Sequence, residues 1–114
     1  MKKHSVICEP GDVVVVPFPF TERLGDKRRP ALVLSKRVFN QSAHTVLAMI
    51  TSTAHRPWPG DSRLADHRAA GLHLPCVVRL KVFTLDNRLI LRKIGQLSAA
   101  DRRMVQENIR TYLF

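Results

Sequence analysis

The order of apolar and polar positions predicts a small protein built mainly from β-strands. The run Asp12–Phe18 contains four consecutive valines, and β-branched side chains fit a pleated sheet better than a helix. Because the run is apolar on both faces, we expect a strand that is buried on both. Further strands are expected at Ala31–Ser35, His44–Thr51, Pro75–Val82 and Arg88–Ile94. The turn residues Thr84–Asn87 predict that the last two strands form a hairpin.

The end of the chain predicts a helix. Ser98 has the character of an N-cap, and Asp101 follows three residues later, as in a carboxylate variant of the capping box. One apolar face, expected to pack on the sheet, recurs at helical spacing: Leu97, Met104, Val105, Ile109, Tyr112 and Leu113. Short strands followed by one helix favour a strongly bent sheet closed as a barrel, and argue against a parallel sheet of βαβ units.

The remaining segments predict loops. Polar residues predict loops at Thr21–Arg29 and around Asn40–Ser42. The segment Ser52–Leu74 is the least regular and reads mainly as loop, with a short helix expected over Arg63–Ala70. Within it, Trp58 lies between two prolines; we favour a place in the barrel core over stacking on a nucleic-acid base.

Length and charge narrow the class of protein. The chain has 114 residues, which predicts one domain over residues 1–114; oligomerisation would help a domain this short. Its net charge of +10 indicates a polyanionic partner, namely nucleic acid, an anionic membrane or an acidic protein segment, with a merely basic surface as the alternative. The N-terminus lacks a signal-peptide apolar region, and no apolar run approaches membrane-spanning length. We therefore expect a cytoplasmic protein in which Cys8 and Cys76 are free thiols.

The positive charge falls into two clusters. The first contains Arg23, Lys27, Arg28, Arg29, Lys36 and Arg37, and the second contains Arg79, Lys81, Arg88, Arg92 and Lys93. On a strand, Arg79 and Lys81 would share one face roughly 7 Å apart, which matches successive phosphates of a nucleic-acid backbone. An ordinary solvated outer face is the alternative. The five histidines form no metal-binding motif, so no metal site is expected.

Four sequence motifs resemble those of the MazF/PemK toxin family. They are Gly11-Asp12 with its apolar strand and Arg29-Pro30-Ala31, then Ile50-Thr51-Ser52, then Val77-Val78-Arg79 with Phe83–Asp86, and finally Ile94–Ser98 leading into a helix. They occur in the family's order over about residues 10–113. The resemblance implies a small SH3-like barrel with a C-terminal helix, the MazF/CcdB-like fold, acting as a homodimer.

The resemblance also implies a function and partners. Family members are toxins of type II toxin–antitoxin systems that cleave single-stranded mRNA at short sequences, without a metal or other cofactor, through a 2′,3′-cyclic phosphate. The expected partners are RNA and a cognate antitoxin with an acidic tail, with operator DNA as a ligand of the toxin–antitoxin complex and no membrane. A non-enzymatic, CcdB-like toxin that binds DNA gyrase is the alternative, and a plain RNA-binding barrel is a third interpretation.

The same resemblance assigns roles to individual residues. Arg29 and Thr51 match the family's phosphate-binding pair. Arg79 matches a position proposed as general acid in some members; because arginine stays protonated, we expect it to stabilise charge in the transition state. The residues expected to position the RNA are Lys27, Arg28, Ser52 and Lys81.

The general base stays unassigned. Some members carry an aspartate where this chain has Lys81, and lysine acts as a base only if its pKa is strongly depressed. Glu22 and Asp26 are other candidates, as is a carboxylate from a second subunit. His55 and His67 lie in the irregular segment, where an acid or base could be held, but we favour plain surface positions for both.

Overall fold

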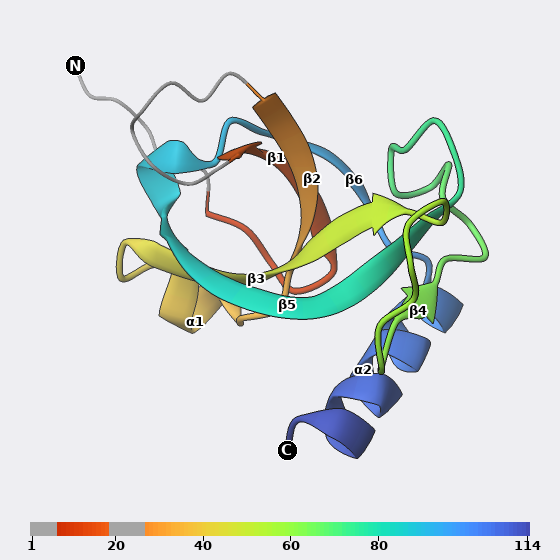
Figure 1. Cartoon of the computed structure of the whole chain (residues 1–114). Coiled ribbons are helices and arrows are strands. Elements are labelled where there is room, and N and C mark those ends of the chain that lie inside the picture. The colour runs from red at the N-terminus through yellow and green to blue at the C-terminus, as the bar shows by residue number, and fades with distance from the viewer. Residues whose placement is uncertain (1–6, 19–26) are drawn as a thin grey trace.

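The sheet is antiparallel throughout and has six strands in the order β4-β5-β3-β2-β1-β6 (Figure 1). The structure is a computed structural model that describes residues 7–18 and 27–114. The strands are β1 (Asp12–Phe18), β2 (Lys27–Val33), β3 (His44–Ser52), β4 (Ser62–Arg63), β5 (Cys76–Asp86) and β6 (Arg92–Gln96). The helical elements are α1 (Arg37–Asn40), the short 3-10 helix η1 (Asn87–Leu89) and α2 (Ala99–Tyr112).

The sheet curls into a half-barrel, with the long strand β5 sweeping along its outer side and α2 at one end (Figure 1). This confirms the predicted mainly β fold with a C-terminal helix. Among the described residues, no helix is long and apolar enough to cross a bilayer.

The first strand is buried on both faces, as predicted. Val13 belongs to a cluster that reaches α2 through Val105. Val14 and Val16 belong to a second cluster, which includes Leu47. Because successive side chains of a strand point to opposite faces, β1 contributes to both clusters and holds the two sides of the curled sheet together.

The predicted hairpin between the last two strands is wrong. Residues 84–86 continue β5 and pair with β3, and β6 pairs with β1 instead of β5. The reason lies in Asn87, which is buried and accepts a hydrogen bond of 2.6 Å from the Thr45 hydroxyl. Its amide also donates to the Asn40 carbonyl at 2.7 Å. Residues that resemble a turn in sequence therefore satisfy tertiary hydrogen bonds.

Two loop predictions also need correction. The second strand starts at Lys27, within the expected polar loop, because β1 is long enough to pair with it from Phe18 onward. It ends at Val33, two residues earlier than expected. Residues 37–40, beside the expected loop at Asn40–Ser42, form the short helix α1.

No helix forms over residues 63–70, contrary to the prediction. Ser62 and Arg63 pair with β5 as the short strand β4. The next backbone groups, the N–H of Ala65 and of Asp66, each donate 3.0 Å hydrogen bonds to the carboxylate of Asp101. These bonds tie the segment to α2 in place of a helical ladder of its own.

The start of α2 confirms the predicted N-cap. The Ser98 hydroxyl accepts from the Asp101 N–H at 3.1 Å. The Asp101 side chain is the acceptor for residues 65 and 66 described above, so it does not close a capping box. The cap stabilises the helix, and the carboxylate anchors it to the loop before β5.

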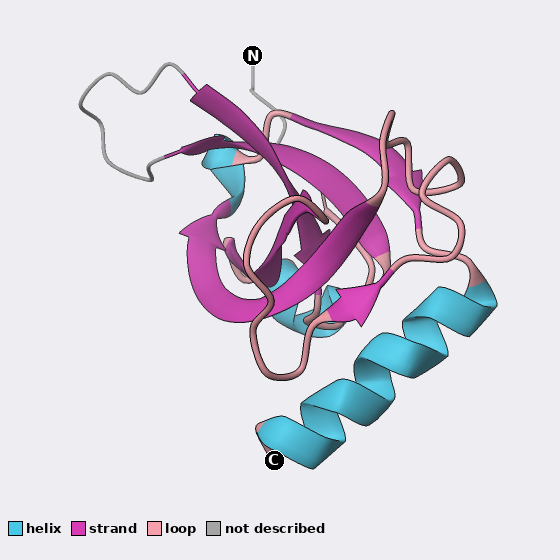
Figure 2. Cartoon of the chain, turned by 45° about the vertical axis from the view of Figure 1, so that its right-hand side comes forward, coloured by secondary structure: helices cyan, strands magenta, loops and turns pink. Residues whose placement is uncertain are grey.

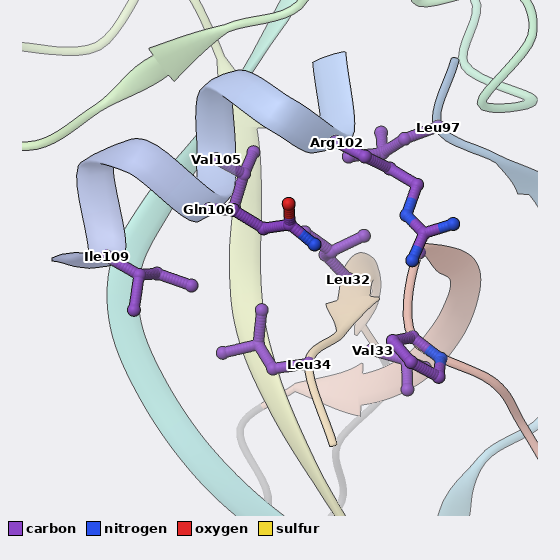
Figure 3. A pocket seen from close by; sticks show the side chains of 10 residues that line it. Leu32, Val33, Leu34, Leu97, Arg102, Val105, Gln106 and Ile109 are labelled. Atoms are coloured by element: carbon purple, nitrogen blue, oxygen red, sulfur yellow. The ribbon is translucent and has the colours of Figure 1, made fainter. Parts of the chain in front are cut away.

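Helix α2 lies beside the curled sheet (Figure 2), and its apolar face is only partly buried. Val105 is buried and Ile109 packs against the core, with Leu32 and Leu34 facing them across a seam (Figure 3). The cavity along this seam is only about 60 Å³, so the helix fits closely there. Tyr112, by contrast, is exposed, and the predicted packing holds for the first three turns.

Candidate functional site

A hollow opens where β2 and β3 diverge. Their pairing ends at Ala31 and Met49, and both strands continue beyond it to Arg29 and Thr51. A cavity of about 280 Å³, here called the Thr51 hollow, lies at this divergence. It is lined by Arg29, Pro30, Ile50, Thr51, Ser52, His55, Leu72, His73, Leu74 and Cys76. The structure thus brings together three of the predicted site residues, which come from two strands.

A second hollow adjoins the first. It has a volume of about 320 Å³, is called the Arg92 hollow here, and is lined by Val15, Arg28, Arg29, Pro30, Gly71, Leu72, His73, Arg92 and Ile94. The two hollows share a wall made of Arg29, Pro30, Leu72 and His73. We refer to the two adjoining hollows together as the groove.

Strand order explains how Arg92 reaches this groove. Val15 of β1 pairs with Pro30 of β2 on one side and with Arg92 of β6 on the other. Because directly opposite residues on an antiparallel sheet lie on the same face, Arg92 lies on the face of the sheet that carries Arg28 and Pro30. Arg29 alternates with these two residues along β2 and lines both hollows. In the sequence Arg92 belongs to a basic cluster, but its position in the groove was not predicted, because β6 was expected to pair with β5 and pairs with β1 instead.

The groove is positively charged. Arg28, Arg29 and Arg92 line it, and no aspartate or glutamate does so among the described residues. The Arg29 guanidinium also lies 5.6 Å from the centre of the Phe18 ring, a cation–π contact that helps to orient it. Planar guanidinium groups bind phosphate oxygens through two hydrogen bonds at once. The groove is therefore suited to a phosphodiester backbone.

Glycines hold the outer wall of the groove in place. Gly71 has a φ of +79°, and a Cβ there would collide with the Ile94 carbonyl oxygen. A Cβ on Gly95 would likewise collide with the Ala70 backbone. The loop can therefore lie directly against β6, where Gln96 N–H donates to the Ala69 carbonyl at 3.2 Å. This approach places Leu72 and His73 on the groove, which no sequence pattern indicated.

Arg79 lines neither hollow, and two of its three guanidinium nitrogens donate hydrogen bonds. Its Nε and one terminal nitrogen donate to the two oxygens of Asp61 at 3.1 and 2.9 Å. The same terminal nitrogen donates to the Arg56 carbonyl at 2.8 Å, and the guanidinium stacks 5.2 Å from the Trp58 ring centre. The hydrogen bond to Asp61, together with the carboxylate charge, raises the pKa of Arg79 despite its desolvation. Arg79 is thus held as a cation and anchors the loop before β4.

The other expected residues are more scattered. Ser52 lines the Thr51 hollow and Arg28 the Arg92 hollow, whereas Lys27 and Lys81 are exposed and line neither. Residues 80 and 81 form a bulge in β5, which has two more residues there than β3. The bulge therefore interrupts the strict alternation of side chains that would place Arg79 and Lys81 on one face of the strand.

Three further expectations concern bases, metals and the tryptophan. Glu22 and Asp26 lie outside the described residues. Within residues 7–18 and 27–114, no group of three His, Cys, Asp or Glu could hold a metal ion. Trp58 is 43% exposed, so its predicted place in the core is wrong: it covers Arg79 instead.

Two histidines at the site were missed or undervalued by sequence analysis. His55 and His73 both line the Thr51 hollow, and His73 lines the Arg92 hollow as well. His67, the other candidate from the irregular segment, lines neither. No motif singles out His55 or His73, because they lie on separate loops that only the tertiary fold brings to one cavity.

The fold is a curled antiparallel sheet with a terminal helix, and its arginine-lined groove contains no aspartate or glutamate from the described part of the chain. These features define a small β protein with a groove suited to a polyanion. The family can be named as well. The chain belongs to the family of PemK-like, MazF-like toxins of type II toxin–antitoxin systems, whose sequence model matches residues 9–113.

Solved structures share the fold. The MazE–MazF complex from Deinococcus radiodurans (Form-III) is 24% identical, with a TM-score of 0.75 over 95% of this chain and 97% of that chain. The Mycobacterium tuberculosis toxin MazF-mt6 is 24% identical, with a TM-score of 0.70 over 88% and 93%. An endoribonuclease in complex with its cognate antitoxin, from a mycobacterial species, is 15% identical, with a TM-score of 0.70 over 92% and 91%. At these identities the likeness concerns the fold. No curated protein sequence matches the chain.

Proposed function

We propose that this toxin is a metal-independent, sequence-specific endoribonuclease that cleaves single-stranded mRNA. The observation that carries the proposal is the position of Arg29 and Thr51 in one hollow of an arginine-lined groove that the described carboxylates leave free. A structure of the same fold described as a mycobacterial endoribonuclease supports the activity.

The chemistry suits these side chains. The 2′-hydroxyl of the RNA attacks the neighbouring phosphorus, the bond to the 5′-oxygen breaks, and a 2′,3′-cyclic phosphate and a 5′-hydroxyl result. The pentacoordinate transition state carries more negative charge than the phosphodiester. Arg29 neutralises that charge with two parallel donors, and the Thr51 hydroxyl donates to a phosphate oxygen. Fixed donors aimed at developing charge are worth about 10²–10³-fold in rate.

The remaining residues bind the RNA on both sides of this point. Arg28 and Arg92 line the adjoining hollow and receive the backbone next to the scissile phosphate. Ser52 lies beside Thr51, while Lys27 and Lys81 provide exposed charge farther along the strand path. Arg79 acts indirectly, by holding the loop that follows β3.

The same groove could also bind an antitoxin. An antitoxin whose disordered tail carries acidic and apolar residues would fold onto a basic groove and block the RNA. The solved complexes of the same fold with MazE and with a cognate antitoxin support this proposal. We further propose a homodimer, and operator DNA as a ligand of the toxin–antitoxin complex.

The activity is tested by incubating the purified protein with heat-denatured bacterial ribosomal RNA in the presence and absence of EDTA. We expect cuts at one short sequence that end in 2′,3′-cyclic phosphate, with and without the chelator, because the nucleophile belongs to the RNA. Salt-sensitive binding without cut ends would contradict the enzyme and indicate a plain RNA-binding protein. Inhibition of DNA gyrase without RNA cleavage would indicate the CcdB-like alternative.

A further inference from the structure

We propose that His55 and His73 are the acid–base pair of the groove, one taking the proton from the 2′-hydroxyl and the other protonating the 5′-oxygen. This inference rests on the proposed ribonuclease function and adds the proton-transfer residues that the family motifs leave open in this chain.

The two histidines lie beside the residues proposed to hold the scissile phosphate. Both histidines line the Thr51 hollow together with Arg29 and Thr51. They reach it from different loops, His55 after β3 and His73 before β5. Both side chains are exposed, so a substrate in the hollow can contact them. In-line displacement needs a base near the attacking oxygen and an acid near the leaving oxygen, and two groups from separate loops can serve these two ends.

The two hollows contain few other described side chains that could transfer a proton. Among the described residues that line the two hollows, only arginines, histidines and Cys76 titrate. Arginine stays protonated, and burial raises the pKa of the Cys76 thiol. Of the described residues expected from family motifs, Lys81 lines neither hollow and Arg79 is bound to Asp61. Histidine is the side chain that exchanges protons near neutral pH.

Hydrogen bonds order the backbone of the two loops that carry these histidines. The His55 N–H donates to the Ser52 carbonyl at 3.3 Å, and the Ala54 N–H donates to the Ser52 hydroxyl at 2.9 Å. Arg79 fixes the following residue through the Arg56 carbonyl. On the other loop, the Leu72 N–H donates to the His67 carbonyl at 3.0 Å. Arg79 is thus a positioning residue for His55.

The proposed cleavage step requires one neutral and one protonated histidine. The neutral imidazole accepts the 2′-hydroxyl proton as the 2′-oxygen forms its bond to phosphorus. The imidazolium gives its proton to the 5′-oxygen as the phosphorus–oxygen bond breaks. The two histidines have then exchanged protonation states, and solvent restores the starting state. A pair of this kind produces a bell-shaped dependence of rate on pH.

Other charged groups face this pair and will influence the pH profile. Arg29 and Cys76 line the Thr51 hollow beside both histidines, and Arg28 and Arg92 face His73 from the adjoining hollow. None of these described groups is a carboxylate, and substitution of each histidine tests which limb of the profile it causes.

The test compares His55→Gln and His73→Gln with His67→Gln, a histidine of the same irregular segment that lines neither hollow. The substrate is a short RNA oligonucleotide that contains a cut site mapped in ribosomal RNA, and a copy with a 2′-deoxy nucleotide at that site measures binding. We expect each groove variant to lose about 10²–10⁴-fold in kcat and one limb of the pH–rate profile, while the deoxy copy binds as it does to the wild type. His67→Gln should keep both rate and profile.

The possible results separate the two proposals. If the wild type cleaves and both groove variants keep its rate and pH profile, the acid–base pair is refuted and the ribonuclease stands. Loss in only one variant would also refute the pair, as would weaker binding with an unchanged kcat. If the wild type leaves no cyclic phosphate ends, the ribonuclease proposal fails and this inference fails with it.

Discussion

Arg79 and Asp61 form a two-point ion pair, with 3.1 Å from Nε to one carboxylate oxygen and 2.9 Å from a terminal nitrogen to the other. Both side chains are largely buried, with 12% and 14% exposure. The pair is completed by the Trp58 N–H, which also donates to Asp61 at 2.9 Å. A residue at a family motif position thus braces the loop that carries His55.

We predict that Asp61→Asn and Arg79→Lys each lower the rate of RNA cleavage by about 10–100-fold, since both loosen the loop and misplace a reacting group. Single-turnover cleavage of an oligonucleotide substrate measures this effect. If Arg79 instead acted directly on the RNA, Asp61→Asn would release it and leave the rate unchanged or higher. Arg110→Ala, on the exposed face of α2, is the matched control.

The ion pair between Arg79 and Asp61 predicts how the free energy of unfolding depends on pH. Burial raises the pKa of Asp61, but the Arg79 hydrogen bonds, the Trp58 N–H and the Arg79 charge outweigh it and bring the pKa below 3.8. A carboxyl with a lowered folded-state pKa stabilises the fold above its unfolded value and loses that contribution as pH falls through the folded value. Asp61→Asn should therefore cost about 1–2 kcal/mol at neutral pH, and urea unfolding should show the difference shrinking below about pH 4. A difference that is constant from pH 7 to 3 would contradict this.

Arg29→Ala should abolish RNA cleavage and growth arrest while the protein stays folded. The guanidinium is exposed and makes only a ring contact in the described structure around it, so its loss removes phosphate binding without removing core packing. Arg29→Lys keeps the charge but not the planar fork, and should recover only part of the activity. Cleavage assays together with circular dichroism check both statements. Wild-type cleavage by Arg29→Ala would overturn the site.

Asp101→Asn should lower the free energy of unfolding by about 1–3 kcal/mol. The Ala65 and Asp66 N–H groups donate to different carboxylate oxygens, and asparagine replaces one of these oxygens with an NH2 donor. The carboxylate is 1% exposed, so water cannot replace the lost acceptor. Ser98→Ala removes only the N-cap and should cost about 1 kcal/mol. Urea titrations of the two variants rank these effects. Equal losses in the free energy of unfolding would show that the hydrogen bonds between α2 and the loop add nothing to stability.

Gly71→Ala should disturb the groove as well as the fold. The added methyl group collides with the Ile94 carbonyl at a positive φ, so the loop must move away from β6 and take His73 with it. We expect lower stability and weaker RNA binding together. Ala69→Gly, which changes an exposed residue of the same loop, controls for flexibility; if Gly71→Ala binds RNA as the wild type does, the loop does not form the groove wall.

Local features of the chain were sufficient to predict much of the fold. The valines of β1 favour a strand wherever they occur, because a β-branched side chain restricts its own backbone. The Ser98 N-cap is equally local, since Ser98 and the Asp101 N–H that its hydroxyl accepts from are three residues apart. Arg29, Thr51 and Ser52 were identified from motifs, and the structure places them in one hollow.

The errors arise where the deciding contact is distant in sequence. Thr84–Asn87 resembles a turn, but the Asn87 side chain bonds to Thr45, 42 residues away. Arg79 resembles a free cation on a strand, but Asp61 and Trp58 surround it. Neither partner can be recognised from the local pattern.

The sequence by itself determined most of the strand segments, the start of the last helix and the strong net positive charge, because side-chain shape, capping and charge act over a few residues or over the whole chain. Only the tertiary structure decided that β6 lies beside β1 and that His55 and His73 share a hollow with Thr51. These outcomes depend on strand order and on how closely loops can approach the sheet. Such close approach is set by packing between distant segments, including the Gly71–Ile94 contact. It produces no periodic pattern in the sequence.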